Sequence, residues 1–105
     1  MIVTQKQAKK RQFLGVDFVL LSHGPSSMVT KMLYKSTDRV PSHSHPNEQS
    51  GYVISGTYRL FIKDIPHELG PGDAYTIPEN VPHHIEIVEP GEVVDLFTPP
   101  RADYL

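Results

Sequence analysis

No cysteine occurs in the 105-residue chain, which excludes disulfide bonds and any metal site built from thiolates. A strong charge of either sign is also missing. Lysine and arginine number 10 and aspartate and glutamate 12, so the formal net charge is only −2 at pH 7. This balance provides none of the concentrated basic surface that is typical of nucleic-acid binding. We therefore expect no nucleic-acid partner.

The sequence has no long apolar segment. No run approaches the roughly 20 residues that a membrane-spanning helix needs. The first twelve residues carry Lys6, Lys9, Lys10 and Arg11 but lack the apolar region of a signal peptide. The sequence therefore predicts a soluble, cytoplasmic protein without membrane contact. The chain length allows one core, so we expect a single domain over residues 1–105.

Helical periodicity is absent, apart from one expected turn near residues 5–11. Short apolar runs recur instead between the ten prolines and seven glycines. The expected strands cover residues 16–21, 28–35, 51–55, 58–62, 65–69, 74–77, 83–88 and 93–97. This spacing is typical of an all-β sandwich or barrel. In the second run, alternation places Met28, Thr30, Met32 and Tyr34 on the inward face.

Two histidines in the middle of the chain indicate a metal site. His43 and His45 are two residues apart, so on an extended strand both imidazole rings point to the same side. Two neutral rings aimed at one point form half of a metal site. Gln49 or Glu48 could add an oxygen ligand after the bend at residues 46–47. Gln49 would give a neutral, more weakly binding site, and Glu48 a site with one negative charge.

A further histidine comes from a later strand. His83 and His84 are adjacent, so they point to opposite sides of a strand. Val81, Ile85 and Ile87 share the face of His83, which predicts that His83 is inward and His84 outward. A lone inward histidine such as His83 is more often a hydrogen-bonded core residue than a metal ligand. A His-x-His pair can also arise by chance, so both interpretations stay open here.

The region around these histidines resembles the first motif of the cupins. The pattern His43-x-His45-x3-Gln49-x6-Gly56 is similar to HxH-x3-4-E-x6-G, with glutamine at the glutamate position. The resemblance implies the cupin double-stranded β-helix, which is a jelly-roll barrel. Because this fold carries many activities, the motif indicates the fold more strongly than the function.

The second cupin motif follows in the expected order. The pattern Gly72-x5-Pro78-x-Asn80-x2-His83 is similar to G-x5-PxG-x2-H. Asn80 replaces the usual glycine, and asparagine adopts the left-handed backbone conformation more readily than most residues. The two motifs together imply a metal site with the ligands His43, His45, Gln49 and His83.

Two segments of the chain resemble one particular group of cupins. Residues 45–56 and 95–105 are similar to the small KdgF-type cupins of pectin and alginate breakdown. That family accelerates the linearisation of 4,5-unsaturated monouronates to 5-keto-4-deoxyuronate. The resemblance implies the same reaction on an acidic sugar, with a divalent transition metal such as nickel, zinc, iron, cobalt or manganese. It also implies functional roles for Asp95, Phe97 and Arg101.

These residue types suit the reaction, although a structural alternative exists. Asp95 and Phe97 share one face of the last strand, and a carboxylate in an apolar interior is costly unless it is paired, metal-linked or functional. Arg101 could bind the uronate carboxylate in bidentate fashion. Asp95 could then move a proton, and Phe97 could pack on the sugar ring. The alternative is an Asp95–Arg101 salt bridge that closes the end of the barrel.

Other functions fit the same fold. A small iron dioxygenase would usually keep an anionic glutamate at the position of Gln49. A cyclase or isomerase acting on another small molecule and a non-catalytic sugar-binding cupin are further alternatives. A sandwich this small exposes strand edges, and pairing of such edges across a two-fold axis is common. We therefore expect a homodimer.

Overall fold

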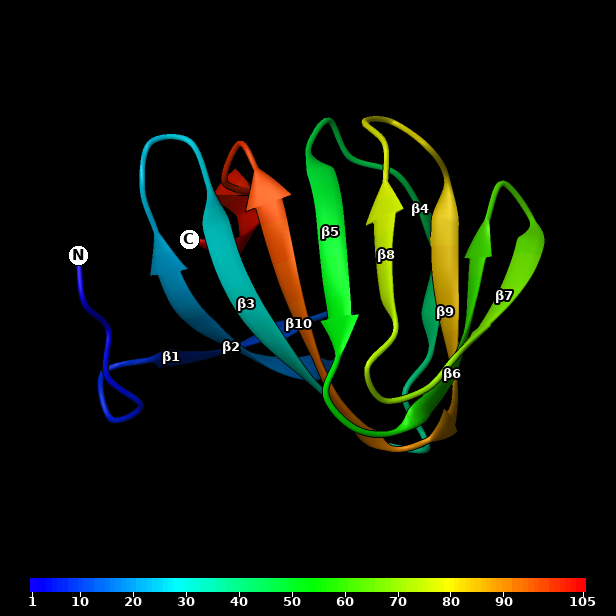
Figure 1. Ribbon diagram of the computed structural model, residues 1–105. Coiled ribbons are helices and arrows are strands. Elements are labelled where there is room, and N and C mark those ends of the chain that lie inside the picture. Colours follow the sequence, from blue (N-terminus) through cyan, green and yellow to red (C-terminus); the bar gives the residue numbers. More distant parts are fainter.

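The computed structural model describes residues 1–105 and consists almost entirely of strands (Figure 1). The elements are β1 (Lys9–Phe13), β2 (Val16–His23), β3 (Met28–Tyr34), β4 (Val40–His43), β5 (Glu48–Val53), β6 (Thr57–Ile62), β7 (Ile65–Leu69), β8 (Ala74–Ile77), β9 (His83–Glu89), β10 (Gly91–Thr98) and the 3-10 helix η1 (Ala102–Tyr104). None of the helical segments has the length and hydropathy to cross a lipid bilayer.

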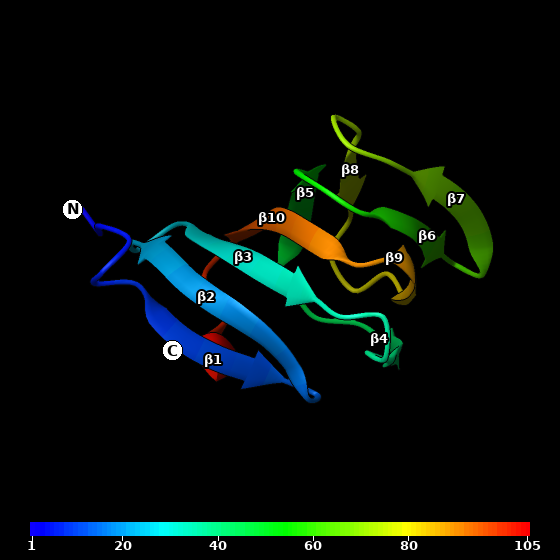
Figure 2. The same ribbon diagram turned by 90° about the horizontal axis from the view of Figure 1, so that it is seen from below.

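The strands form two antiparallel sheets that curl around a common interior (Figure 2). The six-stranded sheet has the order β1-β2-β3-β10-β5-β8, and the four-stranded sheet has the order β4-β9-β6-β7. The last strand, β10, lies between β3 and β5, so the chain's end closes the centre of the larger sheet. The predicted all-β jelly-roll fold is confirmed.

Alternation along the strands produces the core between the sheets. Met28, Thr30, Met32 and Tyr34 of β3 are all buried, which confirms the predicted inward face. Removal of apolar side chains from water at these positions is the main force that holds the sheets together. Core residues from the other strands include Val16, Phe18, Leu20, Val53, Tyr58, Leu60, Ile77, Ile85, Val93 and Phe97.

The N-terminal segment differs from the prediction. A turn covers residues 5–7, but Lys9–Phe13 is a strand rather than part of a helical turn. This strand pairs with β2 from Lys9 opposite Leu20 to Phe13 opposite Val16. Four of its five side chains are exposed, so no apolar alternation could reveal it. Only Phe13, at its end, is partly buried against the core.

Several strand ends also differ, and one difference concerns the histidines. The strand β4 ends at His43, and His45 lies in the following loop, so the prediction of one strand carrying both was wrong. The strand β5 begins at Glu48 rather than at residue 51, because its first residues are polar and gave no apolar signal. The proline-containing tail after β10 is not sheet; it ends in η1.

The loop between β8 and β9 is joined to the loop that carries His45. Asn80 has a positive φ of 61°, which confirms the left-handed conformation predicted for it. Its backbone N–H donates a hydrogen bond to the carbonyl of His45 at 2.8 Å. The two cupin-like motifs are therefore held together directly at one end of the barrel.

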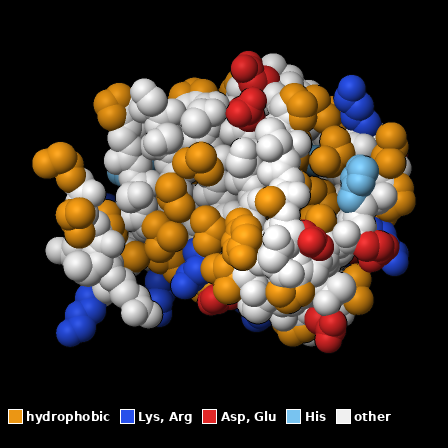
Figure 3. Space-filling model, in the orientation of Figure 1, with side chains coloured by type: hydrophobic (Ala, Val, Ile, Leu, Met, Phe, Trp, Pro, Cys, Tyr) orange, Lys and Arg blue, Asp and Glu red, His pale blue; other side chains and the backbone are white.

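Apolar side chains remain on the outer face of the six-stranded sheet (Figure 3). Tyr52 of β5 and Leu96 of β10 are 52% and 39% exposed. The outermost strands β1 and β8 of one sheet, and β4 and β7 of the other, leave backbone groups free for pairing. The homodimer expected from the sequence stays a prediction.

Candidate metal centre

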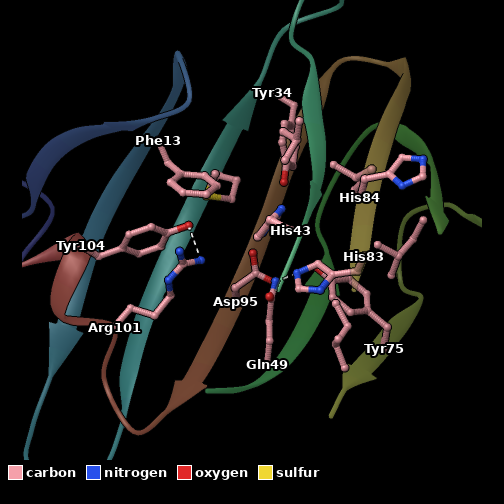
Figure 4. Close-up of a pocket in the computed structure, with 15 residues that line it drawn as sticks. Phe13, Tyr34, His43, Gln49, Tyr75, His83, His84, Asp95, Arg101 and Tyr104 are labelled. Carbon is pink, nitrogen blue, oxygen red and sulfur yellow. Dashed lines mark hydrogen bonds between the residues drawn. The ribbon is translucent and has the colours of Figure 1, made fainter. Parts of the chain in front are cut away.

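Three histidines from separate elements converge inside the barrel. His43 ends β4 and His83 begins β9, and the two residues are directly opposite in the β4–β9 ladder. His45 comes from the loop after β4. One ring nitrogen of each histidine lies within 4.8 Å of those of the other two. The structure therefore brings together all three histidines that the sequence predicted as ligands, and Figure 4 shows two of them, His43 and His83, beside the cavity.

The hydrogen bonds of these rings leave one nitrogen of each ring available. Each Nδ1 faces a backbone carbonyl: His43 that of Pro41 at 3.0 Å, His45 that of Asn47 at 3.0 Å, and His83 that of Val81 at 2.9 Å. A carbonyl only accepts hydrogen bonds, so Nδ1 carries the proton and Nε2 presents a lone pair. The buried Nε2 of His83 has no hydrogen-bond partner. This is the arrangement that a metal ligand requires.

Burial keeps the three rings neutral. Removal from water lowers the pKa of His43 and of His45 below its usual value, and it lowers the pKa of His83 to about 4. The desolvation of a charged ring is the main cause in each case. At neutral pH the cluster therefore consists of uncharged imidazoles, which can bind a metal without first losing protons.

Gln49 places an amide oxygen beside the three histidines. Its side chain is buried on β5, and its Oε1 lies 3.1 Å from Nε2 of His45. Because Nδ1 of His45 carries the proton, this contact joins two lone pairs, which repel each other unless a cation lies against both. Glu48 is exposed on the other face of β5 and does not reach the cluster. The residues present thus fit a divalent transition metal held by three imidazoles and an amide oxygen.

Asp95 lies in the same interior but is not paired as the structural alternative predicted. It is 2% exposed on β10, and no salt bridge joins it to Arg101, so that interpretation was wrong. Tyr75 of β8 instead donates a hydrogen bond from its hydroxyl to Oδ1 of Asp95 at 2.6 Å. Burial raises the pKa of Asp95 to about 6, and hydrogen bonds from Tyr75 and Gln49 limit this rise.

Arg101 is held rigidly beyond the end of β10. Its Nε and Nη2 donate to the two carboxylate oxygens of Asp103 at 3.1 and 2.7 Å, and its Nη1 donates to the Tyr104 hydroxyl at 3.0 Å. The guanidinium carbon also lies 4.8 Å from the ring centre of Phe13, 5.3 Å from that of Phe97 and 4.1 Å from that of Tyr104. Arg101 is therefore buried and oriented before any ligand binds.

Phe97 occupies a different place from the one expected. It is 1% exposed and packs against Arg101 and against the ring of His45, whose centroid is 5.7 Å away. It does not line the cavity between the histidines and Arg101. Phe97 thus supports two neighbours of the cavity rather than presenting its own ring to it.

A small cavity connects these groups (Figure 4). Its volume is about 30 Å³, which is room for one or two water molecules, so a sugar can enter only if side chains at its mouth move. His84 also borders the cavity, but it lies on the opposite face of β9 from His83, as predicted, and its ring stacks on Phe61 with ring centroids 4.3 Å apart. The functional residues lining the cavity are His43, Gln49, Tyr75, His83, Asp95 and Arg101.

Two residues that contribute to the site were missed by the sequence analysis. Tyr75 shares the inward face of β8 with Ile77, so alternation along residues 74–77 could have identified it. Phe13 packs against both Arg101 and His43, with a ring-centroid distance of 5.4 Å to His43. Nothing in the sequence on either side of Phe13 indicates this contact.

Acidic pH is expected to lower the free energy of unfolding of the metal-free protein. The pKa values of His43, His45 and His83 are lower in the folded chain than the ordinary histidine value of 6.5. The unfolded chain therefore binds more protons than the folded chain as the pH falls below about 6.5, which favours unfolding. The raised pKa of Asp95 has the opposite effect on the free energy of unfolding. We expect the three histidines together to outweigh this single carboxyl group.

Urea unfolding of chelator-treated protein at pH 7 and at pH 5 measures this effect. We expect a lower midpoint at pH 5. An equal or higher midpoint at pH 5 would show that the three rings are not held neutral by burial.

Comparison with known proteins identifies the family of this chain. The cupin-domain family Cupin_2 matches residues 31–97. The pectin degradation protein KdgF of Dickeya dadantii (strain 3937) is 37% identical over 65 residues, which cover 60% of this chain and 59% of that protein. The match thus spans less than two thirds of that relative's length.

Solved structures show the same fold over nearly the whole chain. KdgF from Halomonas sp. has a TM-score of 0.87 at 25% identity, with 98% of this chain and 96% of that chain covered. An RmlC-like cupin from Shewanella frigidimarina NCIMB 400 has a TM-score of 0.91 at 22% identity, with 99% and 95% covered. Because the family match extends over well more than half of the residues, the chain belongs to the cupin family.

Proposed function

We propose that this cupin is a metal-dependent enzyme of pectin or alginate breakdown that linearises 4,5-unsaturated monouronates to 5-keto-4-deoxyuronate. The observation that carries the proposal is the convergence of three different groups on one cavity: a neutral metal-binding cluster, a buried carboxylate and a preoriented guanidinium. The similarity to two KdgF proteins supports the same assignment.

Arg101 is suited to bind the carboxylate of the uronate. A guanidinium has five N–H donors, and the contacts to Asp103 and Tyr104 use three of them. One N–H of Nη1 and one of Nη2 therefore remain for a ligand. This pair matches the two oxygens of a carboxylate in a bidentate geometry.

Asp95 is suited to move the proton that ring opening requires. As a carboxylate it accepts the proton of the hydroxyl on carbon 1. The bond between carbon 1 and the ring oxygen then breaks, which leaves an aldehyde at carbon 1 and an enolate at carbon 5. Return of the proton to carbon 4 converts the enolate to the ketone. A pKa of about 6 lets Asp95 act as the base and then as the acid near neutral pH.

The metal-binding cluster completes the proposed site. His43, His45, His83 and Gln49 would hold a divalent metal, which when bound supplies a Lewis acid for oxygens that develop negative charge. Phe97 packs against the guanidinium of Arg101 and helps to keep it in place. The aromatic rings of Phe13 and Tyr104 flank the same guanidinium and limit access of water to it.

Two features weigh against the alternative functions. The neutral amide of Gln49 supports the positive charge of a redox-active metal less well than a glutamate would, which disfavours a dioxygenase. A carboxylate that is 2% exposed and lies beside a cavity is costly to maintain, which is more typical of catalysis than of simple sugar binding.

Product identification tests the proposal. Metal-loaded protein is mixed with unsaturated galacturonate, and NMR spectra follow the appearance of the open-chain 5-keto-4-deoxyuronate. We expect the protein to accelerate this conversion above its spontaneous rate. A product spectrum that evolves at the spontaneous rate would exclude the proposed reaction on this substrate.

The variant Arg101→Lys is expected to raise KM for the uronate by about 10- to 100-fold, since a hydrogen bond to a charged group contributes about 1.5–3 kcal/mol. Lysine keeps the positive charge but loses the planar pair of donors. The matched control is Arg59→Lys on the surface of β6, whose side chain pairs with Glu68 far from the cavity. Steady-state kinetics of both variants provide the measurement.

A neutral substrate provides an independent check on the role of Arg101. The methyl ester of the uronate lacks the negative charge, so we expect it to react poorly with the wild type and to be little affected by Arg101→Lys. Equal turnover of the ester and the acid by the wild type would contradict carboxylate binding by Arg101.

A further inference from the structure

We propose that Tyr75 is a positioning residue that fixes the orientation of the Asp95 carboxylate toward the cavity. Its ring lies over the backbone of Gly51. The inference rests on the proposed function, because it assigns a task to Tyr75 within the same reaction. Neither residue belongs to the metal-binding cluster.

The register of the six-stranded sheet places the three residues in one row. Asp95 of β10 is directly opposite Gly51 of β5, and Gly51 is directly opposite Tyr75 of β8. Residues opposite each other in a ladder project to the same face of the sheet. Strands in a sheet are about 4.8 Å apart, so Asp95 and Tyr75 belong to backbones separated by about 10 Å. Their side chains can meet only across the intervening strand.

The absence of a side chain at Gly51 makes this contact possible. A Cβ atom added to Gly51 would lie 2.0 Å from Cζ and 2.3 Å from the hydroxyl oxygen of Tyr75. The phenol ring therefore rests on the backbone of β5 in the space that any other residue would fill. Glycine inside a strand is unfavourable in itself and commonly marks such a close approach.

The hydrogen bond restricts the carboxylate. The Tyr75 hydroxyl donates to Oδ1 of Asp95 at 2.6 Å, which is the short distance typical of a hydroxyl bound to a carboxylate. Tyr75 thereby occupies one carboxylate oxygen, and Gln49 also donates a hydrogen bond to the carboxylate. Arg101 is bound to Asp103 and so does not orient Asp95. In Figure 4, Asp95 and Tyr75 belong to the strands on either side of β5, the strand that carries Gln49.

Two variants remove this hydrogen bond in different ways. Tyr75→Phe deletes the hydroxyl and keeps the ring, whereas Gly51→Ala keeps the tyrosine but displaces its ring. We expect each variant to lower kcat by about 100-fold, the scale on which small misplacements reduce rates, with KM within about twofold of wild type. The double variant is expected to be no slower than the slower single variant, because both changes remove one interaction.

Two matched controls separate this effect from general damage. Tyr52→Phe removes the hydroxyl of the exposed neighbour of Gly51 on the outer face of the sheet. Gly24→Ala adds a methyl group where no other atom lies within 4 Å. We expect both controls to keep the kcat and the metal content of the wild type. Metal content and the unfolding midpoint are measured for every variant.

A spectroscopic measurement tests the positioning without any turnover. In zinc-loaded wild type we expect a slowly exchanging, downfield hydroxyl proton in the NMR spectrum, which is typical of a short hydrogen bond. The signal should be absent from Tyr75→Phe, lost or shifted in Gly51→Ala, and unchanged in Gly24→Ala. If the wild type fails to linearise the uronate, the proposed function is wrong. The NMR signal still decides whether the space at Gly51 allows the hydrogen bond between Tyr75 and Asp95.

Three results would overturn the inference. The first is the absence of the downfield proton from the wild type, and the second is its persistence without a shift in Gly51→Ala. The third is a kcat of Tyr75→Phe within twofold of an active wild type. If Gly51→Ala does not fold, Tyr75→Phe alone carries the test through its kcat and its spectrum.

Discussion

Replacement of His45 with alanine is expected to abolish stable metal binding while the barrel remains folded. In the proposed site the ring of His45 supplies one of four donors, and Oε1 of Gln49 lies 3.1 Å from its Nε2. Loss of a residue that only orients a ligand weakens metal binding by about 10- to 100-fold, so loss of the ligand itself should exceed this range. Metal content after dialysis and titration calorimetry measure the effect.

The loop position of His45 makes this variant a clean test. His45 lies after the end of β4, so its replacement interrupts no backbone ladder. The matched control is His67→Ala, which removes an exposed histidine of β7 and should leave the metal content unchanged. Retention of one metal per chain by the His45 variant, with wild-type affinity, would refute the assigned cluster.

Replacement of Asp95 with asparagine is expected to lower kcat by about 100- to 10,000-fold, the range that general acid–base catalysis contributes. The amide has nearly the same shape and can still accept the hydrogen bond from Tyr75. It cannot take a proton from the substrate. The folded structure and the metal content should therefore be retained while linearisation is lost.

The unfolding midpoint of Asp95→Asn and the activity of a surface variant complete this test. Asp95 is almost fully buried, and a neutral amide is easier to bury than a carboxylate, so we expect no loss in the unfolding midpoint. Asp17→Asn changes an exposed carboxylate that pairs with Lys35 and should keep full activity. Wild-type activity in the Asp95 variant would eliminate its role as the proton carrier.

The parts of the fold that follow from short-range alternation could be predicted from the sequence. Predicting the inward face of β3 and the opposite directions of His83 and His84 required only the two-residue period of a strand. The left-handed backbone at Asn80 followed from its place in a recognisable turn. In each case the information lies within a few residues of the position concerned.

The parts that depend on contacts between distant segments could not be predicted. The strand β1 is stabilised by backbone pairing with β2, and its exposed side chains carry no apolar pattern. The partner of Arg101 is Asp103 rather than Asp95 because the chain turns into η1 just after β10. The hydrogen bond between Tyr75 and Asp95 depends on the register of three strands. No local pattern encodes such a register.

The central claim is that the histidine cluster and the buried carboxylate together perform a metal-dependent linearisation. The most direct test is the loss of ultraviolet absorbance of unsaturated galacturonate, followed with wild-type protein, with chelator-treated protein and after metal is restored. The account predicts acceleration that the chelator removes and the metal restores. An acceleration that is unaffected by chelation, or none at all from metal-loaded protein, would contradict it.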